Sequence, residues 1–291
     1  MKFKYLFLML VLLATGCTNN VEVAEDNTFN IVTSFYPIYV FAENVVKDIP
    51  DVTVTNMTEN HAGCIHDYSL TTTDMKLISK ADAFIINGVG LESFLEKAYE
   101  TNRDLEVIDS SKGIDILKEN FSDGDNEHIW LSVSNAISQV KNICDGLIEL
   151  DEKNADMYIE NTNRYIEKLE SLRNELREEM YGYTDLKMVT SHDAFSYFAN
   201  DFGFDVIAVI EKEEGVSPTS KEIQEIIDII KENEIKNIFI EEDTSTKLIH
   251  TIVNESGANI IILDTITSGE GNALDYEDRM RNNINAIKES L

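Results

Sequence analysis

The side chains best suited to chemistry in this sequence are histidines and an aspartate at the ends of apolar runs. His128 follows an acidic loop, His192 ends the run MVTSH, and Asp264 ends the run IIILD. His66 lies in HAGCIHDYSL, after a strand-like segment and a loop that contains glycine. Three neutral imidazoles and one carboxylate form a closed tetrahedral shell for Zn²⁺, whereas Mn²⁺ prefers more oxygen ligands. Each histidine alone fits a core or capping role better, so only the set of four predicts a metal site.

Two further side chains are candidates to support such a site. Glu241 ends the run IKNIFIE, and a carboxylate there can orient an imidazole by accepting its N–H hydrogen. His61 lies in the loop before His66, where it is a candidate supporting ligand at the mouth of the site. His250 lies inside the helical segment TKLIHTI, and a surface or packing role is expected for it.

These residues are positioned by an alternation of strands and helices that runs through both halves of the chain. The β-rich runs predict strands at 29–35, 51–58, 83–90, 105–111, 186–192, 204–212, 235–243 and 258–266. Segments of helical spacing predict helices at 38–48, 71–81, 91–102, 194–203, 221–234, 244–257 and 276–291. Ser220 is the expected cap of one helix, and Gly203 and Gly257 are expected to end two others. Because ligands of open α/β sheets bind beyond the carboxyl ends of strands, side chains leaving two such sheets are expected to meet between them.

The predicted fold class is α/β, with two lobes of parallel sheet flanked by helices and joined by one long, rigid linker helix. Strand–helix alternation implies parallel sheets with right-handed crossovers. Residues 131–150 and 151–183 read as helices, and the second has about thirty residues without a proline, which span roughly 45 Å. The expected domains are an N-terminal lobe at 29–150, the linker helix at 151–183 and a C-terminal lobe at 184–291.

The composition excludes several classes of protein. The chain has 291 residues, of which 43% are hydrophobic, so intrinsic disorder and a polytopic membrane protein are not expected. Its 54 acidic and 24 basic residues give a formal net charge of −30. Such a field repels nucleic acids, so no nucleic-acid partner is expected, and it attracts cations. Solvated helix faces or an acidic proteome explain the charge equally well, so the charge alone does not identify a cation binder.

Residues 1–16 have the features of an export signal. Lys2 and Lys4 precede an apolar run, Leu6 to Ala14, that is too short to span a membrane comfortably. The ending LATGC resembles the bacterial lipoprotein signal, in which the cysteine is diacylated before cleavage. By that resemblance Cys17 becomes a lipid anchor, residues 17–28 form a tether, and the protein works at the extracytoplasmic face of the cell membrane. A plain secretory signal with an incidental cysteine is the alternative.

Segments from about Phe29 to the C-terminus resemble the zinc/manganese-type (cluster A-I) substrate-binding lipoproteins of metal ABC importers. The segments are FNIVTSFYPIYVFAENV, GCIHDYSLTTTDMKLISKADAFIINGVGLESFL, NEHIWLS, VTSHDAFSYFANDFGF and IFIEEDTSTKLIHTIVNESGANIIILD. By the family's pattern, the metal lies buried between the lobes, with His66, His128, His192 and Asp264 as its ligands.

The resemblance implies a monomeric binding protein, not an enzyme, that delivers a divalent metal to an ABC transporter permease. Histidine at position 192 favours Zn²⁺, because manganese-binding members often carry a carboxylate there; Mn²⁺ or iron is the alternative. Two departures from the family concern the site. The loop at 112–127 is short and acidic where many zinc-type members are rich in histidine, and it either gathers cations loosely or is simply solvated. Cys64 stands where the family often has an acidic or small residue, and its thiolate is a candidate to join or tune the site.

Other readings remain open from the residues alone. Cys64 and Cys144 can form a disulfide outside the cytosol, or each can be a small buried residue. A zinc hydrolase or hydratase would keep an open coordination position for water, so Asp264 as a fourth ligand argues against it. An adhesin or structural surface lipoprotein is the remaining alternative, for which the histidines at the strand ends would be incidental.

Overall fold

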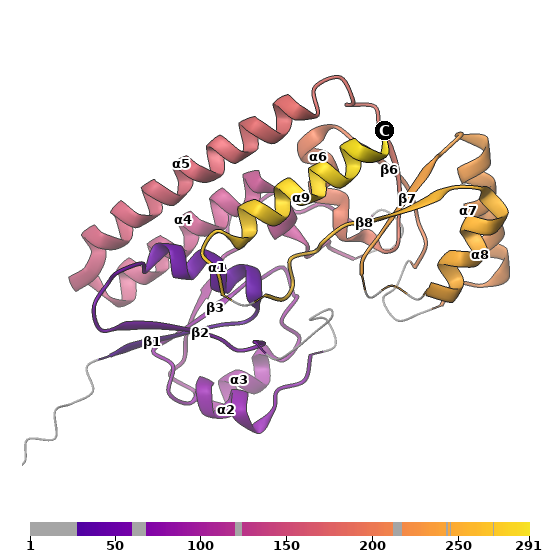
Figure 1. Cartoon of the computed structure of the whole chain (residues 1–291). Coiled ribbons are helices and arrows are strands. Elements are labelled where there is room, and N and C mark those ends of the chain that lie inside the picture. Colours follow the sequence, from indigo (N-terminus) through magenta and orange to yellow (C-terminus); the bar gives the residue numbers. More distant parts are fainter. Residues whose placement is uncertain are drawn as a thin grey trace, which may run out of the picture.

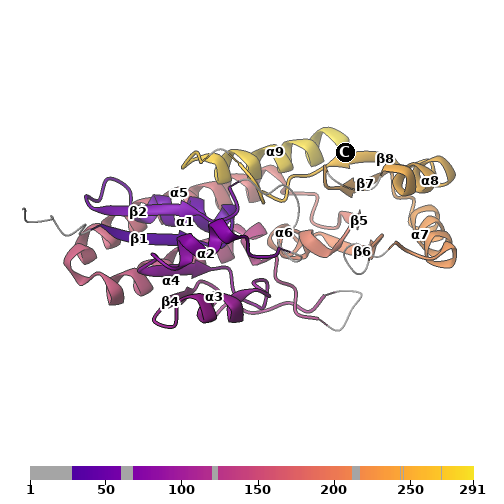
Figure 2. The same cartoon turned by 90° about the horizontal axis from the view of Figure 1, so that it is seen from below.

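The computed structural model describes residues 28–59, 68–119, 124–211, 217–242, 244, 246–269 and 271–291. Over these ranges, two four-stranded parallel sheets are flanked by helices and joined by the long helix α5 (Ala155–Glu179), as Figures 1 and 2 show. The predicted α/β class with two lobes and a long connecting helix is therefore confirmed. The export signal, Cys17 and most of the tether lie outside the described residues, as do His61, Cys64 and His66.

The N-terminal sheet has the strand order β2-β1-β3-β4, and all of its pairs are parallel. Its strands are β1 (Phe29–Thr33), β2 (Val52–Asn56), β3 (Ala83–Ile86) and β4 (Glu106–Asp109). The helices between them are α1 (Tyr36–Val45), α2 (Thr72–Ile78) and α3 (Leu95–Thr101). Every residue of the central strand β3 is buried, which is why its sequence AFII reads as a continuous apolar run.

The C-terminal sheet repeats this order as β6-β5-β7-β8, again in parallel. Its strands are β5 (Lys187–Thr190), β6 (Asp205–Val209), β7 (Asn237–Ile240) and β8 (Asn259–Ile262). Its helices are α6 (Ser196–Phe202), α7 (Ser220–Glu232), α8 (Thr246–Ser256) and α9 (Asp275–Ser290). In both sheets the first strand in the chain lies beside the second and third, so strand ends from separate segments are adjacent at one edge.

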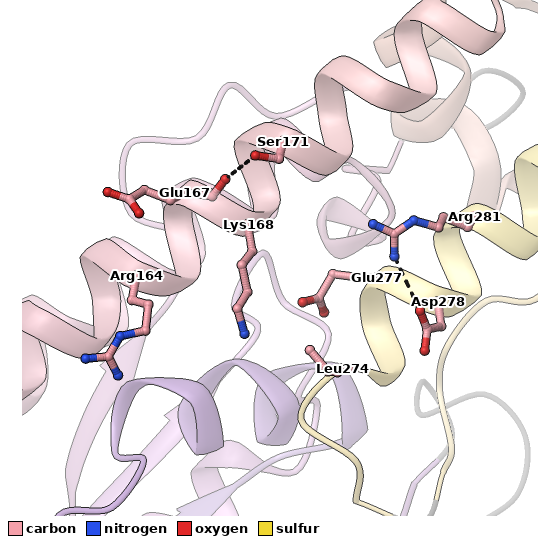
Figure 3. Close-up of a pocket in the computed structure, with 8 residues that line it drawn as sticks. All are labelled: Arg164, Glu167, Lys168, Ser171, Leu274, Glu277, Asp278 and Arg281. Carbon is pink, nitrogen blue, oxygen red and sulfur yellow. Dashed lines mark hydrogen bonds and ion pairs between the residues drawn. The ribbon is translucent and has the colours of Figure 1, made fainter.

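Helices α4 (Val133–Leu150), α5 and α9 connect the lobes along one side of the molecule (Figure 1). The C-terminal helix α9 lies beside α5 and runs in the same direction, since Arg281 Nε pairs with Glu175 Oε1 at 2.9 Å and Lys288 pairs with Glu179 further along both helices. The hollow between these two helices is lined by charged groups of both signs, with Lys168 and Glu277 directed toward each other (Figure 3). None of the described helices is long and apolar enough to cross a membrane.

The ends of several helices follow from their capping residues. Gly203 and Gly257 follow α6 and α8 with φ of 74° and 80°, a left-handed conformation that favours glycine, so these two predictions are confirmed. The prediction of Ser220 as a cap is wrong. Thr219 caps α7, because its hydroxyl accepts from Glu222 N while the Glu222 carboxylate accepts from Thr219 N. This reciprocal pair requires an acidic residue three positions after the cap, and Glu222 stands in that relation to Thr219.

Cys144 is a free, buried cysteine on α4. Burial raises the pKa of its thiol, as expected for a small core residue that is not reactive. Of the two alternatives considered for Cys144, the structure therefore shows a buried free thiol and not a disulfide.

Candidate metal centre

Two segments that follow strands and one loop before a helix bring His192, Glu241 and His128 together. His192 follows β5 by two residues, and Glu241 directly follows β7, the neighbour of β5 in the sheet. His128 directly precedes a short 3₁₀ helix, Ile129–Leu131, that leads into α4. The two histidines and the glutamate therefore come from segments far apart in the sequence. Because β5 and β7 are neighbours in the sheet, the segments that follow them place His192 and Glu241 side by side.

The imidazole of His192 is held by Glu241. The His192 Nδ1 atom contacts Glu241 Oε1, and the Glu241 backbone N–H donates to Ser191 Oγ at 3.3 Å. The two side chains are only 15% and 20% exposed. An ionised carboxylate can only accept a hydrogen bond, so Nδ1 of His192 carries a hydrogen. In the neutral ring, the lone pair then lies on Nε2, which is the nitrogen that can bind a metal.

The imidazole of His128 is held in the same way by Asn126. The side-chain oxygen Oδ1 of Asn126 accepts from His128 N at 3.0 Å and lies 3.2 Å from His128 Nδ1. The Asn126 Nδ2 atom donates to Asp193 O at 2.7 Å, which fixes which end of the amide is oxygen. Because an oxygen faces His128 Nδ1, this nitrogen also carries the hydrogen, and Asn126 ties the His128 loop to the segment after His192.

The two Nε2 atoms of His128 and His192 face each other at 3.1 Å. With both Nδ1 atoms facing acceptors, two neutral rings would direct their lone pairs at one another, which is unfavourable without a proton or a metal cation between them. Two nitrogen ligands bound to a tetrahedral Zn²⁺ at ~2.0–2.1 Å lie about 3.3 Å apart. The observed separation fits this geometry closely, so the histidine pair can provide two adjacent corners of a zinc shell.

An aromatic wall covers one side of the pair. The Trp130 ring is fully buried and its centroid lies 5.1 Å from that of His128. Its Nε1 donates to Thr265 O at 2.8 Å, and Phe35 packs edge-on against it at 4.8 Å. Trp130 therefore joins the N-terminal lobe to the segment that carries Asp264, and it limits the access of water to this side of the histidines.

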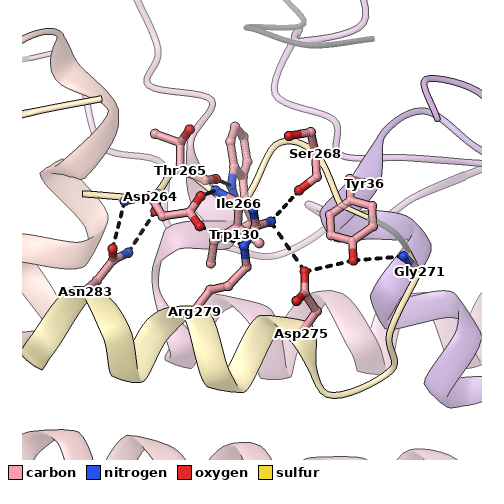
Figure 4. Close-up of polar contacts among 10 residues, drawn as sticks. All are labelled: Tyr36, Trp130, Asp264, Thr265, Ile266, Ser268, Gly271, Asp275, Arg279 and Asn283. Atoms are coloured by element: carbon pink, nitrogen blue, oxygen red, sulfur yellow. Dashed lines mark hydrogen bonds and ion pairs between the residues drawn. The ribbon is translucent and has the colours of Figure 1, made fainter. Parts of the chain in front are cut away.

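Asp264 lies in that neighbouring segment, two residues after β8, and its carboxylate contacts Arg279 (Figure 4). Arg279 Nε lies 2.7 Å from Asp264 Oδ2, and Ile266 N donates to Oδ1 at 2.7 Å. Asn283 holds the backbone of Asp264 through two hydrogen bonds of 2.8 Å. Among the contacts of the described residues, the Asp264 carboxylate is thus bound to α9 and to its own loop rather than to His128 or His192.

The remaining candidate residues either lie outside the described part of the chain or have been placed away from this histidine pair. His66, Cys64 and His61 lie outside the described residues, and within the described ranges no group of three or more His, Cys, Asp or Glu side chains is arranged to hold a metal. In the described part of the loop at 112–127, Lys118 pairs with Asp125. His250 is exposed on α8, as expected.

Sequence reasoning missed Asn126 and Arg279. An asparagine two residues before a loop position can bond the backbone N–H of that position, so the spacing of Asn126 and His128 carried a usable signal. Arg279 had no comparable signal, because it lies 15 positions beyond Asp264 and meets it only through the packing of α9 against the segment after β8.

Comparisons with known proteins agree with this fold. Residues 31–290 match the family model ZnuA, zinc-uptake complex component A, periplasmic. The manganese-binding lipoprotein MntA of Halalkalibacterium halodurans is 29% identical, over 99% of this chain and 98% of the relative. The iron-binding protein YfeA of Yersinia pestis is 30% identical, over 96% and 94%. The solved structure of FpvC from Pseudomonas aeruginosa in complex with Mn²⁺ superimposes with a TM-score of 0.81 at 28% identity, covering 90% of this chain and 98% of that one.

The matched region leaves out only the first 30 residues and the last one. A match of this extent, together with relatives aligned over nearly their whole length, establishes the family. The chain belongs to the ZnuA family of extracytoplasmic metal-binding proteins, the substrate-binding components of ABC importers, which serve transport and are not enzymes.

Proposed function

We propose that this protein captures Zn²⁺ between its lobes and delivers it to the permease of an ABC importer. The proposed ligands are His66, His128, His192 and Asp264. The observation that carries the proposal is the pair of Nε2 atoms 3.1 Å apart, each on a ring whose Nδ1 faces an oxygen acceptor. Such a pair is arranged to share one cation before any cation arrives, which reduces the cost of organising the site.

Zinc is the preferred metal because at least two of the proposed ligands are imidazoles held in the correct tautomer. Zn²⁺ binds readily to a shell rich in nitrogen, whereas Mn²⁺ gains more from carboxylate oxygen. Mn²⁺ is the second candidate, favoured by the manganese-binding names of MntA and of the FpvC complex. The name of YfeA makes iron the third. Binding of any of the three weakens as the pH falls, because a protonated imidazole cannot be a ligand.

The location and assembly state belong to the same proposal. Cys17 is the proposed lipid anchor, which would keep the binding protein near its permease at the outer face of the membrane. The chain is proposed to act as a monomer, because its proposed ligands all come from one chain. Release of the metal would then depend on small shifts of the lobes when the permease is engaged.

The test is metal content and competitive binding with untagged residues 18–291. Zinc bound after purification is measured by mass spectrometry, and affinities for Zn²⁺ and Mn²⁺ are measured by competition with a chelating dye. His192→Ala is the test variant and His250→Ala is its matched control, since His250 is exposed on α8. We expect one tightly held zinc per chain, retained by the control and lost by His192→Ala.

Two results would change the proposal. Tighter binding of Mn²⁺ than of Zn²⁺ would keep the transport role and the site but replace the metal. No stoichiometric metal in the unmodified protein, or equal loss in His192→Ala and His250→Ala, would reject the assigned site.

A further inference from the structure

Arg279 is a fixed cation beside a proposed metal ligand. Its guanidinium contacts Asp264 and Asp275, with an Nη1 to Asp275 Oδ2 distance of 3.4 Å. It also donates to the carbonyl oxygen of Ser268, and its Cζ lies 5.9 Å from the centre of the Tyr36 ring. The side chain is only 22% exposed. Four groups other than solvent therefore surround it, and three of them hold it in place without any help from Asp264 (Figure 4).

Both carboxylate oxygens of Asp264 also have partners. One oxygen accepts from a backbone N–H and the other faces Arg279 Nε at 2.7 Å. The side chain is 38% exposed, so it is accessible to an incoming cation. A metal that takes Asp264 as a ligand must compete with the guanidinium for the same negative charge, or bind beside a carboxylate whose charge is already balanced.

We propose that Arg279 is a specificity-determining residue that favours Zn²⁺ over Mn²⁺ by weakening Asp264 as a ligand. The proposal rests on the proposed function. Zn²⁺ binds strongly to imidazole nitrogens such as those of His128 and His192 and tolerates a weak carboxylate ligand, whereas Mn²⁺ depends more strongly on an anionic oxygen donor. The repulsion between Arg279 and the bound ion is common to both metals, since both are divalent. The difference between the metals comes from the reduced contribution of the Asp264 carboxylate.

The test compares affinities of the full mature chain for Zn²⁺ and Mn²⁺ in Arg279→Gln and in the unmodified protein. We expect Arg279→Gln to bind Mn²⁺ about fivefold more tightly, with a much smaller change for Zn²⁺, since about fivefold is the upper end of what a partly exposed ion pair contributes. Arg281→Gln is the matched control. It removes the same charge from the same helix, but Arg281 pairs with Glu175 on α5.

A double-variant cycle separates the effect on Asp264 from general electrostatics. In an Asp264→Asn background, Arg279→Gln should no longer raise the affinity for Mn²⁺. If Arg279→Gln proves poorly folded by circular dichroism, Arg279→Lys keeps the charge but lacks the Nε donor, and a smaller shift in the same direction is expected.

Three results would overturn the inference: an unchanged ratio of zinc to manganese affinity in Arg279→Gln, an equal shift in Arg281→Gln, or a shift that persists with Asn at position 264. These are distinguishable from a failure of the proposed function, which would appear as the absence of stoichiometric metal in the unmodified protein.

Discussion

The imidazoles of the proposed metal centre are oriented by acceptors that differ in charge. Glu241 presents a carboxylate to His192, whereas Asn126 presents a neutral amide oxygen to His128. A carboxylate stabilises the imidazole N–H and makes the opposite nitrogen a stronger donor to a metal. His192 is therefore expected to be the more strongly bound of the two ligands, and Glu241 to contribute to affinity without touching the metal.

Glu241→Gln should weaken zinc binding by about tenfold, at the lower end of the range for residues that orient a ligand. Glutamine can still accept the His192 hydrogen bond, so the loss reflects the missing charge rather than a misplaced ring. Competition with a chelating dye measures the effect. Glu242→Gln is the control, because Glu242 is the next residue and is exposed. Equal affinities for the two variants would contradict the role assigned to Glu241.

The sequence limited what could be predicted of this site at the scale of single residues. His192 and Glu241 both follow strands, so sheet topology alone suggested that they lie on the same edge. The partner of Asp264 could not be predicted in this way. Arg279 reaches it from a helix whose position depends on packing against α1 and α5, and local sequence patterns do not encode such packing.

Among the elements, the turn between β3 and α3 joins the N-terminal sheet to the proposed metal centre. Glu92 belongs to this turn, and its buried carboxyl accepts from Asn87 N at 2.7 Å and from Gly88 N at 3.1 Å. Asn87 Nδ2 in turn donates to Glu127 O at 2.9 Å, one residue before His128. The buried carboxyl thus supports the turn that holds the His128 loop.

The stability of the protein should depend on pH through Glu92. Burial raises the pKa of Glu92 to about 7, from an ordinary value of 4.5. Between these values the folded chain retains a proton that the unfolded chain has released, so the free energy of unfolding falls as the pH rises from about 4.5 to 7 and then levels off. The loss attributable to Glu92 is at most about 3 kcal/mol.

Urea unfolding of the metal-free protein at pH 5 and pH 8 measures this dependence. The stability of the unmodified protein relative to Glu92→Gln should be lower at pH 8 than at pH 5, because glutamine does not titrate. Glu96→Gln is the control, since Glu96 is exposed on α3. The assignment fails if Glu92→Gln and Glu96→Gln show the same change between the two pH values.

At the scale of elements, the sequence predicted the order and type of the strands and helices, because alternation and helical spacing extend over many residues. It placed their ends less well. The predicted strand at 83–90 ends at Ile86, since Gly88 and Gly90 adopt positive φ in the turn that follows. The predicted cap of α7 is one residue late. Thr219 and Ser220 are both suitable caps by residue type, but only Thr219 has the acidic partner at the required spacing.

For the whole molecule, the two lobes share a hydrophobic core. A single cluster of buried side chains extends from Ile31 and Phe84 of the N-terminal sheet, through Leu172 of α5, to Phe198 of α6 and Ile284 of α9. A smaller cluster, which includes Ile227 and Ile252, lies under α7 and α8. Because α6 belongs to the C-terminal lobe but packs into the larger cluster, opening the molecule about a hinge would expose buried apolar surface.

The closure that accompanies metal binding should therefore be small. Because backbone shifts of about 1 Å or less are typical of preorganised binding partners, small-angle X-ray scattering of the metal-free and zinc-loaded protein is expected to give radii of gyration that agree within the error of the measurement. The His192→Ala variant in the same zinc solution controls for aggregation, since it lacks one of the proposed ligands. A reproducible decrease in the radius of gyration on adding zinc, seen in the unmodified protein alone, would indicate domain closure. In that case α5 and α9 could not act as a rigid brace, and the shared core would have to separate in the metal-free state.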